Sequence, residues 1–176
     1  MRVLLGGMNT SVVMTVLAAD RAGLVSLLSE TIAAHDGNWL ESRMSRLAGQ
    51  FAGILRVECP SGKTGELLEA LAALESHGVS IQAKMEEYAA TVPRDLLTLD
   101  VMGNDRPGIV RALAATLAAA GANVEDLHTA LESAPMAGHA IFHAKGVVSL
   151  PAGTDPTSLI SAIEKLGPDL SVSIED

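Results

Sequence analysis

The sequence predicts an α+β protein built from two ferredoxin-like domains of order βαββαβ, and three observations support this prediction. First, residues 20–39 and 105–124 match without gaps, so one structural unit occurs twice. Second, β-branched runs and segments of helical spacing follow the same order in both halves. Third, clusters of Gly, Pro, Asn and Asp separate the predicted strands and helices from one another. This order is typical of a four-stranded antiparallel sheet that carries both helices on one face.

The first half contains four predicted strands and two predicted helices. Its first strand is β-branched and apolar, and its first helix keeps apolar residues at helical spacing until the turn residues Asp36-Gly37-Asn38. Gly49 marks a turn between two strands, and Gly78 ends the second helix. The strands are expected at 12–18, 39–46, 51–58 and 79–85, and the helices begin at Leu24 and near Leu67.

The second half repeats this order. Its first helix runs from Ile109 to Gly121, and its second ends near Gly167-Pro168. The strands are expected at 97–101, 123–131, 139–150 and 170–174. We therefore expect an extension at 1–10, a domain at 11–88, a linker at 89–94 and a second domain at 95–176. Units of roughly eighty residues are marginally stable alone, so they should pack together or dimerise.

Composition excludes several classes of function. The net charge of −9 and the aromatic content of 2% argue against direct nucleic-acid binding, which needs clustered Lys and Arg and stacking side chains. No apolar run approaches the ~20 residues of a membrane span. The single cysteine, Cys59, cannot form an intrachain disulfide, which suits a reducing cytoplasm, and a plain buried or edge thiol is expected.

No residue set argues for catalysis or for a metal. His139 and His143 share one face of a predicted strand, where four residues separate them by roughly 13 Å, too far for one ion. No phosphate-binding glycine motif and no nucleophile signature is apparent. We therefore expect no enzyme activity, no cofactor and no metal.

The repeated Asp-Arg-x-Gly loop is the candidate site, and two interpretations are open. In the structural one, Asp caps the following helix and Gly permits the tight turn into it. In the functional one, the first helical turn offers N–H groups to a carboxylate, and Asn38 and Asn123 at the far helix ends offer amides. Pro107 would stiffen the second loop.

These motifs resemble the ACT domain, a small regulatory module that often binds amino acids. Asp-Arg-Pro-Gly-Ile-Val at 105–110 and Gly-Ala-Asn-Val-Glu-Asp at 121–126 carry the resemblance, and the first half carries a variant with Ala22 in place of proline and Trp39 beside Asn38. The tandem pair, at 10–87 and 95–176, resembles the glycine cleavage system transcriptional repressor family. The resemblance implies ligand-binding roles for Asp105, Arg106, Pro107, Gly108 and Asn123, and also for Asp20, Arg21, Gly23 and Asn38.

The resemblance implies a cytoplasmic regulator that senses a small amino acid such as glycine. It would control transcription of amino-acid metabolism through a protein partner, such as a transcription factor, without contacting DNA or a membrane. The ligand is expected where one Asp-Arg-x-Gly loop meets a neighbouring unit, in a homo-oligomer. The alternative is an ACT-like interaction scaffold whose loops are structural and which binds no small molecule.

Overall fold

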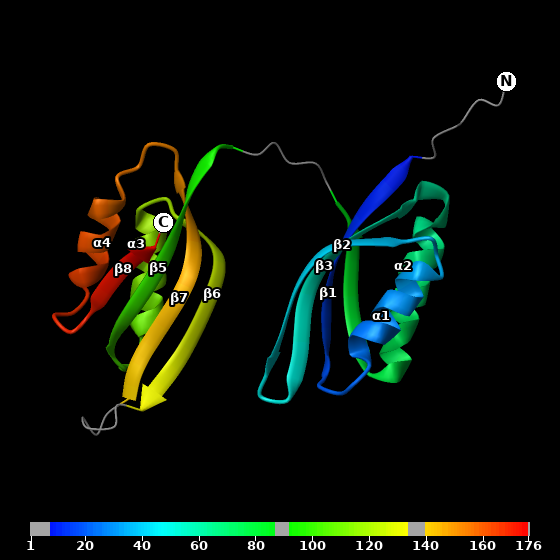
Figure 1. Ribbon diagram of the computed structural model, residues 1–176, viewed down its shortest axis with the longest axis horizontal. Helices are drawn as coiled ribbons and strands as arrows, with labels where there is room; N and C mark the ends of the chain where they lie inside the picture. Colours follow the sequence, from blue (N-terminus) through cyan, green and yellow to red (C-terminus); the bar gives the residue numbers. More distant parts are fainter. Residues whose placement is uncertain (1–7, 87–91, 134–139, 176) are drawn as a thin grey trace. The chain divides into compact units, whose positions relative to one another are not determined.

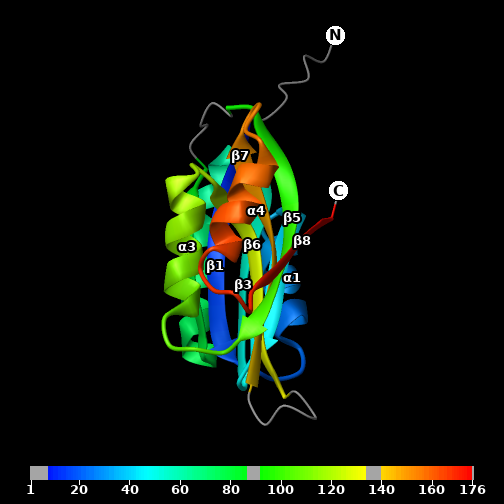
Figure 2. The ribbon, with the colours of Figure 1, turned by 90° about the vertical axis from the view of Figure 1, so that its left-hand side faces the viewer.

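Two four-stranded antiparallel sheets form the frame of the protein, one in each half of the chain (Figure 1). The computed structural model describes residues 8–86, 92–133 and 140–175. The chain divides into two compact units, residues 1–89 and 90–176. In each unit both helices cover one face of the sheet, as Figure 2 shows for α3 and α4 of the second unit. The predicted α+β fold with two βαββαβ units is therefore confirmed.

The first unit has the strand order β2-β3-β1-β4. Short 3-10 turns, Ser61–Lys63 and Leu74–His77, flank its second helix. A two-residue turn at Ala48 and Gly49, both with positive φ, joins β2 to β3. Its elements are β1 (Asn9–Ala19), α1 (Leu24–Ala33), β2 (Asn38–Leu47), β3 (Gln50–Pro60), α2 (Thr64–Ala73) and β4 (Val79–Met85).

The second unit repeats this topology with the strand order β6-β7-β5-β8. Its second helix starts with a side-chain cap, because Asp155 accepts a hydrogen bond from the Thr157 backbone N–H at 3.0 Å. Its elements are β5 (Arg94–Asn104), α3 (Ile109–Ala119), β6 (Asn123–Ser133), β7 (Ala140–Pro151), α4 (Pro156–Glu164) and β8 (Ser171–Glu175).

Strand register is equivalent in the two units and places alternate residues in the core. Val12 of β1 lies opposite Val57 of β3, and Leu97 of β5 lies opposite Val148 of β7. Because side chains alternate across a strand, these residues face the helices and their neighbours face the open side of the sheet. Each unit thus has its own core, in which Leu28 and Ile163 are fully buried. The open sheet faces carry polar side chains together with exposed apolar ones such as Leu17, Ile54 and Leu96.

The domain edges differ slightly from those expected. Asn9 and Thr10, placed in an extension, pair with Pro60 and Cys59 and so begin β1. Arg94, placed in a linker, pairs with Pro151 and begins β5. Strand pairing extends these elements beyond their apolar runs, which were the only signal in the sequence. No helix among the described residues is long and apolar enough to cross a membrane.

Candidate functional site

The two Asp-Arg-x-Gly loops have the same backbone geometry. Gly23 and Gly108 occupy the cap positions of α1 and α3 with φ of 88° and 86°, a conformation that favours glycine. The loops are anchored alike, since the Asp20 N–H donates to the Gly49 carbonyl at 2.9 Å and the Asp105 N–H to the Ala140 carbonyl at 3.0 Å. The expectation that glycine permits the tight turn into each helix is therefore confirmed.

The structural interpretation of the loop has aspartate cap the helix, and the structure contradicts that part of it. Neither α1 nor α3 has a side-chain cap, because the glycine itself occupies the cap position and the aspartate lies three residues earlier. The Asp20 carboxylate instead accepts a hydrogen bond from Arg46 Nη1 at 3.3 Å, and Asp105 is exposed. The helix starts therefore keep backbone N–H groups that no side chain caps.

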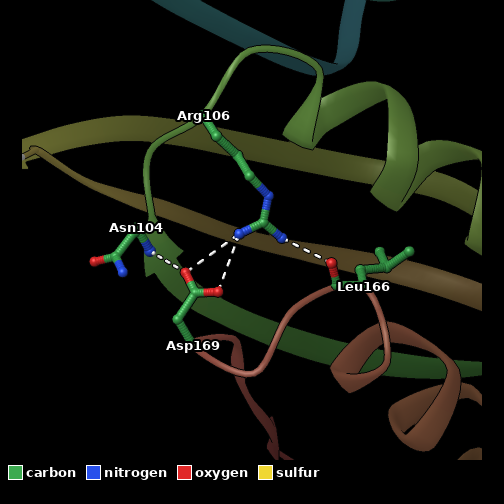
Figure 3. A network of polar contacts seen from close by, with 4 residues as sticks. All are labelled: Asn104, Arg106, Leu166 and Asp169. Atoms are coloured by element: carbon green, nitrogen blue, oxygen red, sulfur yellow. Dashed lines mark hydrogen bonds and ion pairs between the residues drawn. The ribbon is translucent and has the colours of Figure 1, made fainter.

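Arg106 connects its loop to the segment that precedes β8 (Figure 3). Its Nη1 lies 3.0 Å from Asp169 Oδ1 and 3.3 Å from Oδ2, and its Nη2 donates to the Leu166 carbonyl at 2.9 Å. The Asn104 backbone N–H also donates to Asp169 Oδ2, at 2.8 Å. This backbone hydrogen bond, together with the Arg106 guanidinium, holds the pKa of Asp169 below its usual value.

In the first unit, Arg21 connects its loop to the segment before β4 and makes fewer contacts than Arg106. Its Nη2 donates to the His77 carbonyl at 2.7 Å, at the end of the turn that follows α2. The first unit passes to β4 through Gly78 alone, whereas the second unit inserts Pro168 and Asp169 before β8. Both arginines thus hold the connection from the second helix to the last strand, and only the second unit adds a carboxylate.

The two asparagines lie in polar networks at the other ends of the same helices. Asn123 Nδ2 donates to Glu125 Oε1 at 2.9 Å, and the same oxygen accepts from the buried Ser149 hydroxyl at 2.5 Å. Arg94 joins this network through Ser149 and the Gly121 carbonyl. In the first unit, Asn38 Nδ2 lies 3.4 Å from Glu58 Oε1.

The structure therefore does not bring the predicted residues of one unit together. Arg106, Pro107 and Gly108 precede α3, and Asn123 follows it. The helix has 11 residues and so spans roughly 16 Å. A small amino acid cannot reach both ends of this helix. Arg106 and Asn123 of one unit therefore cannot contact the same ligand molecule. The arrangement in the first unit, with Arg21 and Asn38 flanking α1, is the same.

The two departures of the first repeat from the second, one in the loop and one in β2, have different surroundings. Ala22 and Pro107 are both exposed, so neither is required by packing. Trp39 is half-buried and packs against the first core, directly after Asn38. Its bulk therefore serves the core of the first unit.

A polar cavity on the open face of the first sheet was not predicted. It has a volume of about 370 Å³, and Glu41, Arg43, Arg56 and Glu86 line it together with apolar side chains. A signal for it exists in the sequence. Counting outward from the Ala48-Gly49 turn pairs Arg43 with Ile54 and Glu41 with Arg56. Cross-strand pairing could thus have placed these charges on one face.

The open face of the second sheet carries a histidine between two carboxylates. His143 Nε2 lies 2.9 Å from Asp100 Oδ1, and His143 Nδ1 lies 3.0 Å from Glu132 Oε1. Hydrogen bonding to Glu132 and then to Asp100 raises the pKa of His143. His139 lies outside the described residues. Within the described ranges no group of His, Cys, Asp and Glu is arranged to hold a metal ion.

Cys59 is a buried free thiol, as predicted. Its Sγ lies 3.4 Å from the Thr64 hydroxyl, at the point where β3 gives way to α2. The side chain is 1% exposed, so it serves the core of the first unit.

Comparison with known proteins gives a family and two related folds. The family model of the ACT domain matches residues 10–84 and 95–134. The crystal structure of an unknown protein from Galdieria sulphuraria is 28% identical, with a TM-score of 0.85 over 96% of this chain and 98% of that one. A protein described provisionally as a glycine cleavage system transcriptional repressor is 14% identical, with a TM-score of 0.69 over 96% and 99% of the two chains. No curated protein sequence matches the chain significantly.

Proposed function

Because the chain belongs to the ACT domain family, with the fold repeated in tandem, we propose that it is a non-catalytic regulatory protein that senses a small amino acid. The observation that carries the proposal is the shared geometry of the two helix starts. Both α1 and α3 begin at an exposed left-handed glycine, and no side chain caps either helix. A ligand carboxylate is stabilised by the backbone N–H groups and the dipole at such an end.

Asp105 and Asp20 complete the proposed contacts at the helix starts. Asp105 is exposed on the loop before α3, so its carboxylate can accept hydrogen bonds from a ligand ammonium. Arg106, Arg21, Pro107, Gly108 and Gly23 shape the two loops. Glycine is the first ligand to test, because it has no side chain to accommodate and because a protein of the same fold is described provisionally as a glycine cleavage system repressor.

A second copy of the chain would enclose the ligand. Asn123 and Asn38 lie a helix length from the loops of their own unit, so they would contact a ligand only across an oligomer interface. Ligand binding would then favour one assembly over another, by its difference in affinity for the two states. The regulated partner would be a cytoplasmic protein that controls transcription, since a net charge of −9 opposes direct contact with DNA.

A thermal-shift panel of the twenty amino acids against the full chain tests the proposal. A ligand at a hundred times its dissociation constant adds about 2.7 kcal/mol, which raises the melting temperature by roughly 5–10 °C for a chain of this size. Asp105→Asn and Asn123→Ala should each reduce the glycine response. Arg111→Met, an exposed change on α3, should leave it intact. No response to any amino acid would refute amino-acid sensing.

The second candidate function is an interaction scaffold without a small-molecule ligand. One observation favours it: Arg106 and Asn123 already make hydrogen bonds within their own unit. The scaffold predicts a flat thermal-shift panel and a folded chain that still captures its protein partner.

A further inference from the structure

The cavity on the open face of the first sheet is bounded by apolar and charged side chains from β1, β2 and β3 and by Glu86 just after β4. Val13 and Ile54 provide apolar surface, and Ile54 is 56% exposed. Its volume of about 370 Å³ lies within the range of small-molecule pockets. Glu41, Arg43, Arg56 and Glu86 supply two negative and two positive charges, so their formal charges sum to zero.

Arg56 is the centre of the charged group. Its Nε lies 2.9 Å from Glu41 Oε1, and its Nη1 lies 3.5 Å from Glu86 Oε2. Ser11 donates a hydrogen bond to the same Glu86 oxygen at 2.5 Å. The Ser11 hydroxyl, and after it the Arg56 guanidinium, lower the pKa of Glu86, so that this carboxylate is ionised at neutral pH.

We propose that this cavity, the sheet-face site (Val13, Glu41, Arg43, Ile54, Arg56 and Glu86), binds a small zwitterion with a branched aliphatic side chain, such as valine or leucine. The ligand carboxylate pairs with the guanidinium groups, its ammonium with the glutamates, and its side chain covers Val13 and Ile54. The site is separate from the helix-end loops, and its ligand class rests on the proposed function. A group with zero net charge favours a zwitterion over a simple anion or cation of the same size.

One hydrogen-bond donor of Arg56 has no acceptor among the described residues, and a bound ligand could change that. Its Nε–H is buried and makes no hydrogen bond to any described residue, because it does not point well at Glu41 despite the 2.9 Å separation. An unsatisfied buried donor is costly, so each one in a folded protein needs an explanation. A carboxylate bound beside Arg56 lets the guanidinium turn toward better acceptors.

The second unit lacks this site at the equivalent positions of its sheet. In the first unit, Val13, Arg56 and Glu41 lie side by side across β1, β3 and β2. In the second unit, the corresponding row is Thr98, Val147 and Asp126. Valine replaces the central arginine, so the carboxylate in this row has no guanidinium beside it. Arg56→Val therefore converts the central position of the site into that of the second unit.

Isothermal titration calorimetry of L-valine and L-leucine into the full chain tests the assignment. Arg56→Val should weaken valine binding at least about tenfold, since a hydrogen bond between charged groups is lost. Glu41→Gln keeps the shape of the site and should weaken binding similarly. Valinamide and 3-methylbutanoate, which lack the carboxylate and the ammonium respectively, should each bind at least about tenfold more weakly than valine. Arg111→Met, an exposed change on α3, should leave valine binding unchanged.

The outcomes separate this assignment from the proposed function. Loss of valine binding in Arg56→Val and Glu41→Gln, with retention in Arg111→Met, supports the sheet-face site. Valine binding that persists in both site variants overturns the site while amino-acid sensing stands. A wild-type chain that responds to glycine but not to valine or leucine also overturns the sheet-face site and leaves amino-acid sensing standing. A wild-type chain that binds no amino acid overturns both.

Discussion

Arg106 and Asp169 are 63 residues apart in the sequence, yet the guanidinium and the carboxylate approach to 3.0 Å. The pair joins the loop before α3 to the segment before β8, where Arg106 also donates to the Leu166 carbonyl. A motif residue that the sequence suggests for ligand binding is therefore part of the internal structure of the second unit. Any ligand role of Arg106 has to be compatible with these contacts.

Asp169→Asn should make stability less dependent on acid pH. The pKa of Asp169 is lowered in the folded state, so its carboxylate stabilises the fold above the unfolded pKa of about 3.9, and this stabilisation is lost as the pH falls through the lower folded value. Urea unfolding at pH 7 should show a weaker variant, and the difference should shrink below about pH 4. Asp105→Asn, on the exposed part of the loop, is the control. A difference that stays constant to pH 2 would contradict this account.

Gly108→Ala should destabilise the second unit by about 1–2 kcal/mol, since alanine is strained at positive φ. Nothing lies within 4 Å of the added methyl group, so the strain comes from the backbone alone. Gly65→Ala in α2 is the matched control, because it also meets nothing within 4 Å but lies in a helix with ordinary φ. It should stabilise by about 0.5–1 kcal/mol. Denaturant melts of the two variants should shift in opposite directions, and a shared direction would exclude backbone strain as the cause.

The fold could be predicted because its signals are local and repeated. Gly23 and Gly108 recur at one fixed offset, and the apolar positions around Leu28 and Leu113 keep helical spacing in both copies. Hydrogen-bond partners are not local. Asp169 falls in a two-residue insertion with no counterpart before β4, so the repeat that identified Arg106 could not reveal its partner.

The candidate site was predicted only as a set of residues. Arg106 and Asn123 were recognised by their place in the repeat, but a repeat gives no distance between the two ends of a helix. The charged residues of the sheet-face site were not predicted, because the alternation of side chains along one strand does not say which residues lie opposite each other on neighbouring strands. The strand register determines these pairs, and the register of β2 and β3 depends on the turn at Ala48 and Gly49.

Leu28→Ala should destabilise the first unit by about 2–5 kcal/mol, as expected for a leucine that is 0% exposed in the core. Val25→Ala on the same helix is the control, since Val25 is 49% exposed and its loss should cost less than about 0.5 kcal/mol. Chemical denaturation followed by circular dichroism measures both. Equal effects of the two substitutions would mean that α1 does not pack on the sheet through the face that carries Leu28.

The pKa of His143 should lie above the ordinary histidine value, and the stability of the second unit should depend on pH accordingly. Its two ring nitrogens face Glu132 and Asp100, and only the imidazolium can donate a hydrogen bond to both. Because the pKa of His143 is raised in the folded state, the contribution of His143 to the stability of the fold is complete below the unfolded pKa of about 6.5. This contribution is lost as the pH rises through the folded pKa.

NMR titration of the His143 ring protons measures the folded pKa directly. Glu132→Gln should bring it down, because it removes the carboxylate with the largest effect. The stability difference between wild type and His143→Gln should accordingly be larger at pH 5.5 than at pH 9, and the reverse order would show that His143 is held as the neutral ring.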